Sequence, residues 1–140
     1  MASIIKAFKT ASEKKLVKHW DKNYILVDIH ATVLKPSYHN EEKFEFYPYA
    51  KEVLKLLSDN KEYSLILWTS TYSDKIEMYL EEFSKHGISF DYVNINTDEA
   101  NTDIGCFDEK TYFDVGLDDK FGFEPETDWE LIFDYLKNRK

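Results

Sequence analysis

The sequence predicts an α/β domain in which a parallel sheet of about four strands has helices on both faces. Short apolar runs typical of buried strands alternate with segments in which apolar residues recur every three or four positions, as on one face of a helix. The length of 140 residues fits a single domain over residues 1–140, and 43% hydrophobic residues are sufficient for a core.

The first expected element is a helix over residues 12–20, within an N-terminal extension of about residues 1–21. One face of this helix contains Leu16, Val17 and Trp20. The first strand follows over residues 24–28, as a continuous apolar run that ends on Asp28. A run without polar alternation predicts a buried strand, so the carboxylate of Asp28 is expected at the edge of the sheet.

The middle of the chain continues this alternation. A helix is expected to start near Pro48, because a first helical turn tolerates the missing N–H of proline. Its apolar stripe has the spacing of a core-facing helix: Ala50, Val53, Leu54 and Leu57. The second strand is expected over residues 63–69. Ser73 is a suitable N-cap for a third helix that stops at Gly87. Its inward side chains are Ile76, Tyr79, Leu80 and Phe83.

The remaining strands are expected over residues 90–95 and 112–117. A last helix over residues 127–138 buries Trp129, Ile132, Phe133 and Leu136. Because right-handed crossovers bring the carboxyl ends of parallel strands to one edge, four strand ends should converge: Asp28, Thr69, Ile95 and Asp118. The result is a three-layer, Rossmann-like domain in which two long connections, residues 29–47 and 96–111, leave that edge.

Composition limits the partners and the compartment. The net charge of −9 disfavours a long nucleic-acid duplex, because neutralising phosphates requires a basic face. The single cysteine, Cys106, excludes an intramolecular disulfide and fits a reducing compartment. No stretch approaches the roughly 20 apolar residues of a membrane span. We therefore expect a cytoplasmic protein without a membrane partner.

The residues expected at the edge of the sheet suit phosphate chemistry. Asp28 and the pair Asp118-Asp119 offer the carboxylate oxygens that Mg²⁺ prefers, and two adjacent acids at a strand end repel each other without a cation. The Thr69 hydroxyl could donate to a phosphoryl oxygen, and Lys110, just before the fourth strand, could balance the remaining charge. Each residue alone is also compatible with a plain turn, cap or solvated surface position.

In this order, the residues resemble the four motifs of the haloacid dehalogenase superfamily of phosphohydrolases. The motif D-x-D-x-T corresponds to Asp28-Ile29-His30-Ala31-Thr32, and a strand ending in Thr or Ser corresponds to Leu65-Ile66-Leu67-Trp68-Thr69-Ser70. The motif lysine corresponds to Lys110, and the paired acids to Val115-Gly116-Leu117-Asp118-Asp119. The resemblance covers about residues 24–125 and is greatest to small cap-less members common in bacteriophage and bacterial genomes.

The resemblance implies a role for each matching residue. Asp28 would be the nucleophile that forms an aspartyl-phosphate. Mg²⁺ would bind Asp28, the backbone carbonyl of His30 and Asp118, with Asp119 assisting through water. The phosphoryl group would be held by Thr69, Ser70 and Lys110, for which Lys120 is an alternative lysine. Thr32 would brace the turn after the first strand. Only 18 residues separate His30 from Tyr49, so no large cap domain is expected.

His30 departs from the family pattern, because phosphatases of this family have a second aspartate there. That aspartate protonates the leaving group and then activates water. A histidine with an unperturbed pKa near 6.5 can do both. Two functions follow: a Mg²⁺-dependent phosphomonoester hydrolase acting on nucleotides, polynucleotide ends or other phosphorylated small molecules, or a catalytically impaired binding or scaffold domain.

The N-terminal extension leaves further alternatives open. Its apolar residues could pack on the domain or form a homo-oligomer contact. It also contains the basic cluster of this acidic chain: Lys6, Lys9, Lys14, Lys15 and Lys18. The cluster is compatible with a solvated helix face, a membrane surface or a nucleic acid.

Overall fold

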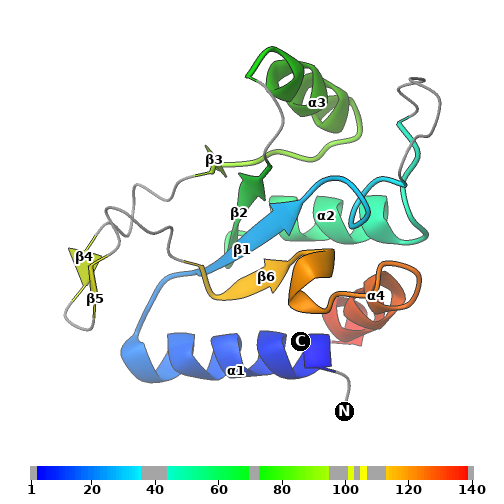
Figure 1. The fold of residues 1–140 in the computed structure, drawn as a ribbon. Helices are drawn as coiled ribbons and strands as arrows, with labels where there is room; N and C mark the ends of the chain where they lie inside the picture. Colours follow the sequence, from blue (N-terminus) through cyan, green and yellow to red (C-terminus); the bar gives the residue numbers. More distant parts are fainter. Residues whose placement is uncertain are drawn as a thin grey trace.

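The computed structural model describes residues 3–35, 44–69, 73–94, 101–102, 105–106 and 113–138 (Figure 1). Within these residues the chain forms a four-stranded, all-parallel sheet flanked by four helices, which confirms the predicted α/β, Rossmann-like class. The helices are α1 (Ser3–Lys18), α2 (Ala50–Asp59), α3 (Ser73–Lys85) and α4 (Asp128–Asn138), with the short 3-10 helix η1 (Asp119–Phe121). The strands are β1 (Asn23–Asp28), β2 (Tyr63–Trp68), β3 (Tyr92–Val93), β4 (Asn101–Thr102), β5 (Gly105–Cys106) and β6 (Val115–Leu117).

The sheet has the order β3-β2-β1-β6, so β1 is a central strand (Figure 1). It pairs with β2 along its whole length, from Asn23 opposite Tyr63 to Asp28 opposite Trp68. On its other side β1 pairs with β6, where Val27 lies opposite Leu117. Because all four strands run in the same direction, their carboxyl ends meet at one edge, and Asp28 and Asp118 come to lie there as neighbours.

One hydrophobic cluster joins the sheet to all four helices. Alternate strand residues project to the same face, and those in the cluster include Ile25, Val27, Leu65, Leu67, Val115 and Leu117. The helices contribute buried side chains to the same cluster: Ile4 and Phe8, the predicted stripe of α2, Tyr79 and Phe83, and Trp129 and Ile132. Burying a large apolar side chain stabilises a fold by about 1.5–3 kcal/mol, so this cluster holds the strands in register.

The first helix starts earlier than predicted, and Leu16 and Val17 on its predicted apolar face do not pack on the domain. The helix begins at Ser3, and it buries Ile4, Phe8, Ala11 and Lys15, whereas Leu16 and Val17 are 71% and 75% exposed. Ile4, Phe8 and Ala11 have the spacing of one helix face, and polar contacts accompany this face near the end of the helix. The Lys15 ammonium forms a 2.9 Å ion pair with Glu62, and the Asn23 amide donates to the Ala11 carbonyl. A lysine can bury its stem while its charged end is paired, so Lys15 occupies a position that looks polar in the sequence.

The two edge strands of the sheet, β3 and β6, are shorter than predicted. Strand β3 covers two of the expected residues 90–95, because Asn94 has a φ of 58° and leaves the extended conformation. Strand β6 starts at Val115 rather than at residue 112. The connection expected as a loop over residues 96–111 contains the antiparallel pair β4 and β5. Two-residue strands are too short to give a recognisable periodicity. Ile95 and Tyr112 lie outside the described residues.

Among the helices of the described segments, none is both long and apolar enough to cross a bilayer.

The orientation of α1 can be tested by a matched pair of substitutions. Phe8→Ala should destabilise the chain by about 3 kcal/mol, because Phe8 is buried against Tyr63 and Tyr135. Leu16→Ala should change the free energy of unfolding by less than about 0.5 kcal/mol, because that side chain faces water. Urea unfolding followed by far-UV circular dichroism measures both. A larger loss for Leu16→Ala than for Phe8→Ala would show that the predicted face, and not the observed one, is buried.

Candidate metal centre

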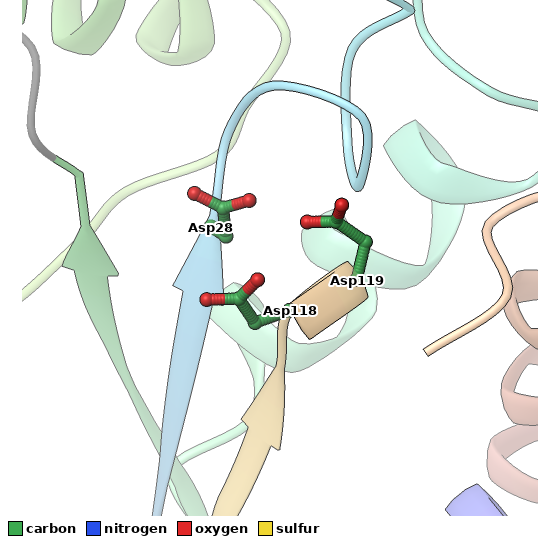
Figure 2. Close-up of side chains that lie close together, drawn as sticks. All are labelled: Asp28, Asp118 and Asp119. Atoms are coloured by element: carbon green, nitrogen blue, oxygen red, sulfur yellow. The ribbon is translucent and has the colours of Figure 1, made fainter. Parts of the chain in front are cut away.

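Three carboxylates converge at the carboxyl edge of the sheet (Figure 2). Asp28 ends β1, Asp118 follows β6, and Asp119 begins η1. One oxygen from each lies within 4.8 Å of the others, and Figure 2 shows the three side chains around a common space. Asp118 is buried, Asp28 is half-buried and Asp119 is exposed, so the cluster is open to solvent on one side.

Thr32 connects the two halves of this cluster. Its hydroxyl donates to Asp28 Oδ2 at 3.1 Å and accepts from the backbone N–H of Asp119 at 3.0 Å. The Thr32 side chain is fully buried, and its carbonyl accepts a 2.8 Å hydrogen bond from the indole of Trp129. Thr32 therefore braces the turn after β1, in the position that the sequence analysis expected, and it ties that turn to η1 and α4.

The residues after β6 hold Asp118 in place. The backbone N–H of Lys120 donates to Asp118 Oδ1 at 2.9 Å, and the N–H of Phe121 donates to the Asp118 carbonyl at 2.9 Å. Asp118 thus caps η1, which ends at Gly122 with a φ of 90°. A left-handed conformation is easiest for glycine, and here it ends the short helix directly after the acidic pair.

The cluster is electrostatically unfavourable when it is fully ionised. Burial raises the pKa of Asp28 from 3.8 to about 6, and the charge of Asp118 contributes in the same direction. The hydrogen bond from Thr32 opposes this increase. Burial also raises the pKa of Asp118; the N–H of Lys120 opposes this, whereas the nearby Asp119 carboxyl adds to it. A divalent cation would favour the ionised forms of Asp28 and Asp118 and so lower both pKa values. Carboxylate oxygens are the ligands that Mg²⁺ and Ca²⁺ prefer.

The side chain of His30 is directed to α3. Its Nε2 lies 2.9 Å from the hydroxyl of Tyr79, and the two rings meet edge to face with centroids 5.5 Å apart. His30 is exposed, whereas Tyr79 is buried. The imidazole therefore already has a protein partner at the position where the family pattern has an acid.

Thr69 follows β2 and is held by a residue that the sequence analysis missed. The side chain of Asn94 accepts from the Thr69 N–H at 2.8 Å and donates to the Thr69 carbonyl at 2.9 Å. Asn94 lies within the strand expected over residues 90–95, so the sequence contains no signal for this contact. Two other predicted phosphate ligands, Ser70 and Lys110, lie outside the described residues. The alternative lysine, Lys120, is exposed in η1 next to the cluster.

These features define an α/β domain of Rossmann-like architecture with an acidic cluster at the carboxyl edge of its sheet. No protein-family model matches the chain, and no curated protein matches it. Among solved structures, the chain is similar to a conserved protein coded by a locus from Bacteroides thetaiotaomicron, with 26% sequence identity and a TM-score of 0.61. The match covers 85% of this chain and 93% of that chain, so the two share the fold over most of their lengths.

The raised pKa of Asp28, which results first from burial and then from the charge of Asp118, makes a prediction about pH. Because folding raises the pKa of Asp28, the folded chain binds more protons than the unfolded chain between about pH 4 and pH 6, and stability falls as the pH rises through this window. In EDTA at pH 8, Asp28→Asn should be more stable than wild type by about 1 kcal/mol, after allowance for solvent screening. The difference should approach zero near pH 4, as measured by urea unfolding.

Asp21→Asn is the matched control, because Asp21 is an exposed carboxylate outside the cluster. It should show no comparable gain at pH 8. An Asp28→Asn variant that is no more stable than wild type at pH 8 would mean that burial and the neighbouring charges do not destabilise the ionised Asp28.

Proposed function

We propose that the chain is a Mg²⁺-dependent phosphomonoester hydrolase of the haloacid dehalogenase type, with Asp28 as its nucleophile. The observation that carries this proposal is the set of three carboxylates, from the ends of β1 and β6, whose oxygens lie within 4.8 Å. These are the positions that the resemblance assigns to the nucleophile and the metal ligands. The all-parallel sheet supports the proposal, because open α/β folds bind ligands at this edge.

In the proposed reaction, a carboxylate oxygen of Asp28 attacks phosphorus while the bond from phosphorus to the leaving oxygen breaks. The leaving oxygen takes a proton, and water then cleaves the aspartyl-phosphate to release phosphate and restore Asp28. Thr32 orients Asp28 through its hydroxyl at 3.1 Å. The side chain of Asn94 fixes the backbone of Thr69 by two hydrogen bonds. The Thr69 hydroxyl would donate to a phosphoryl oxygen, together with Ser70 and Lys110.

The metal would be held by Asp28, Asp118 and the backbone carbonyl of His30, with Asp119 assisting through water. When bound, Mg²⁺ supplies charge neutralisation between the anionic nucleophile and the phosphate. Without such a cation, the raised pKa of Asp28 means that part of the population carries a neutral carboxyl near pH 6. Nucleotides and the phosphorylated ends of polynucleotides are the substrates that we propose.

A second candidate function is a binding domain that retains the phosphate and metal site without turnover. The contact of His30 with Tyr79 favours it, because a proton donor must reach the leaving oxygen and this imidazole is already hydrogen-bonded at Nε2. The two candidates share Asp28, Asp118 and Asp119 and differ only in what residue 30 does.

The metal and phosphate site, which both candidate functions require, can be tested without a substrate. Mg²⁺ with beryllofluoride, a mimic of phosphoryl bound to aspartate, should raise the melting temperature of wild type by several degrees, because a ligand at one hundred times its Kd stabilises the fold by about 2.7 kcal/mol. Asp28→Asn should abolish the increase, since the aspartyl oxygen is the attachment point.

Asp21→Asn is again the control and should respond like wild type. Mg²⁺ alone and beryllofluoride alone separate the two ligands. An equal increase in Asp28→Asn, or no increase in any variant, would contradict a nucleophile at Asp28.

Turnover distinguishes the two candidates. If His30 transfers the proton, His30→Ala should lower kcat for p-nitrophenyl phosphate by about a hundredfold, whereas His30→Asp should keep or raise it. Malachite green detection of phosphate, compared at saturating Mg²⁺, measures this effect. Wild type without phosphate release, despite a normal response to beryllofluoride, would favour the binding domain. A large loss in His30→Asp would show that the imidazole itself is required.

A further inference from the structure

A groove of about 650 Å³ lies between α1 and the residues that precede β6. Lys6, Lys14 and Lys18 line it from α1, and Phe113 and Asp114 line it from the other segment. Helix α1 runs below β1 and β6 in Figure 1, and the two residues of the other wall come just before β6 in the sequence. It is distinct from the acidic cluster, which lies beyond the opposite end of β6.

The three lysines are concentrated on a protein of the opposite charge. The chain has a net charge of −9, yet within the described segments Lys6, Lys14 and Lys18 form no ion pair. Their neighbour Lys15 does, with Glu62 at 2.9 Å. The one carboxylate that lines the groove, Asp114, accepts a 2.7 Å hydrogen bond from the N–H of Tyr24. Three lysines and one carboxylate therefore line the groove, which leaves it with an excess of positive charge.

The lysines are arranged as a row along the helix axis. Lys14 and Lys18 are four residues apart and therefore neighbours on the helix surface, whereas Lys6 lies two turns earlier and about 80° around the helix from Lys14. With a rise of 1.5 Å per residue, the row is about 18 Å long. A linear array of positive charges suits a ligand with regularly repeated negative charges better than it suits a single anion.

Aromatic rings accompany this row. Trp20 lines the groove beyond the end of α1, and Phe113, 37% exposed, lines its other wall. The Phe113 ring is stacked on that of Phe121, with centroids 6.1 Å apart and planes 5° apart. A Cβ on Gly116 would lie 2.7 Å from the Phe121 ring, so the glycine at this position allows the stacked pair to lie on β6. Phe121 is 57% exposed and follows Asp119 by two residues.

We propose that this groove binds single-stranded nucleic acid. Proteins that bind single strands combine a positively charged groove along the phosphates with aromatic rings on which bases stack, and both are present here. A duplex would bring its dense charge against the acidic remainder of the surface. A bilayer is a flat surface and would contact the rims of the groove, whereas a flexible strand can enter it.

The stacked pair gives the groove a direction. Phe113 lines the groove and Phe121 adjoins the acidic pair, so a strand that stacks on both rings would present its end to Asp118 and Asp119. This step rests on the proposed function, and it identifies the substrate as the phosphorylated end of a single strand. Binding in the groove itself does not depend on the metal or on Asp28.

Binding can be measured by fluorescence anisotropy of a short labelled oligothymidylate, in EDTA, with wild type and with Asp28→Asn. Both should bind, and log K should fall with log salt with a slope of about −2 for three phosphate contacts, roughly 20-fold between 50 and 200 mM salt. The variant Lys6→Gln/Lys14→Gln/Lys18→Gln should lose this binding. Phe113→Leu should weaken it by about tenfold through lost stacking.

The control variant Lys51→Gln/Lys55→Gln/Lys61→Gln removes three exposed lysines elsewhere and changes the net charge equally. If both triple variants lose affinity for oligothymidylate equally, the binding depends only on net charge and the proposal is overturned. The absence of binding at 50 mM salt would also overturn it. Binding to phosphatidylserine vesicles but not to oligothymidylate would assign the groove to a lipid surface instead.

The link to the acidic cluster has a separate readout. With Mg²⁺, the groove variant should slow phosphate release from a phosphorylated oligothymidylate at least tenfold, while release from p-nitrophenyl phosphate stays at the wild-type rate. Equal rates on the oligonucleotide would overturn the link. Failure of wild type to release phosphate from either substrate would overturn the proposed function and leave the oligonucleotide affinity as the test of the groove.

Discussion

The in-register pairing of β1 with β2 and β6 is the interaction on which the rest of the structure depends. It aligns Asp28 with Trp68 on one side and brings it beside Asp118 on the other. A shift of one residue would move every strand side chain to the opposite face and remove Val27 and Leu117 from the core. The hydrophobic cluster thus fixes the register, and the register in turn fixes the distance between the two carboxylates.

The fold therefore maintains an arrangement that is unfavourable in itself. Three acidic groups lie together, and two of them have raised pKa values because they are buried and close to like charges. Hydrogen bonds from Thr32 and from the N–H of Lys120 offset part of this cost, and Trp129 secures Thr32 from the side of the core. Raised pKa values of this kind cluster at functional sites, and a bound cation would offset the repulsion among the three carboxylates.

Much of the fold was predictable from the sequence, because its central elements follow from local patterns. Strand β1 is a continuous apolar run, the stripe of α2 has helical spacing, and paired acids end β6. The errors occurred where distant polar contacts decide the structure. Lys15 is buried and pairs with Glu62, which is far away in the sequence, so this buried position of α1 looks polar in the sequence. The partners of His30 and Thr69, Tyr79 and Asn94, also lie in other elements and leave no periodic signal.

In the proposed function, the turn after β1 separates the residues that would bind the metal from the residue that would transfer a proton. Its conformation depends on Thr32, on the positive φ of Ala31 and on the Ile29 carbonyl, which accepts from the N–H groups of Val33 and Leu34. The side chain of His30 contributes to none of these contacts and meets Tyr79 instead. Residue 30 can therefore change chemically while the backbone that surrounds Asp28 stays in place. A substitution at residue 30 is therefore expected to leave the acidic cluster and the fold in place.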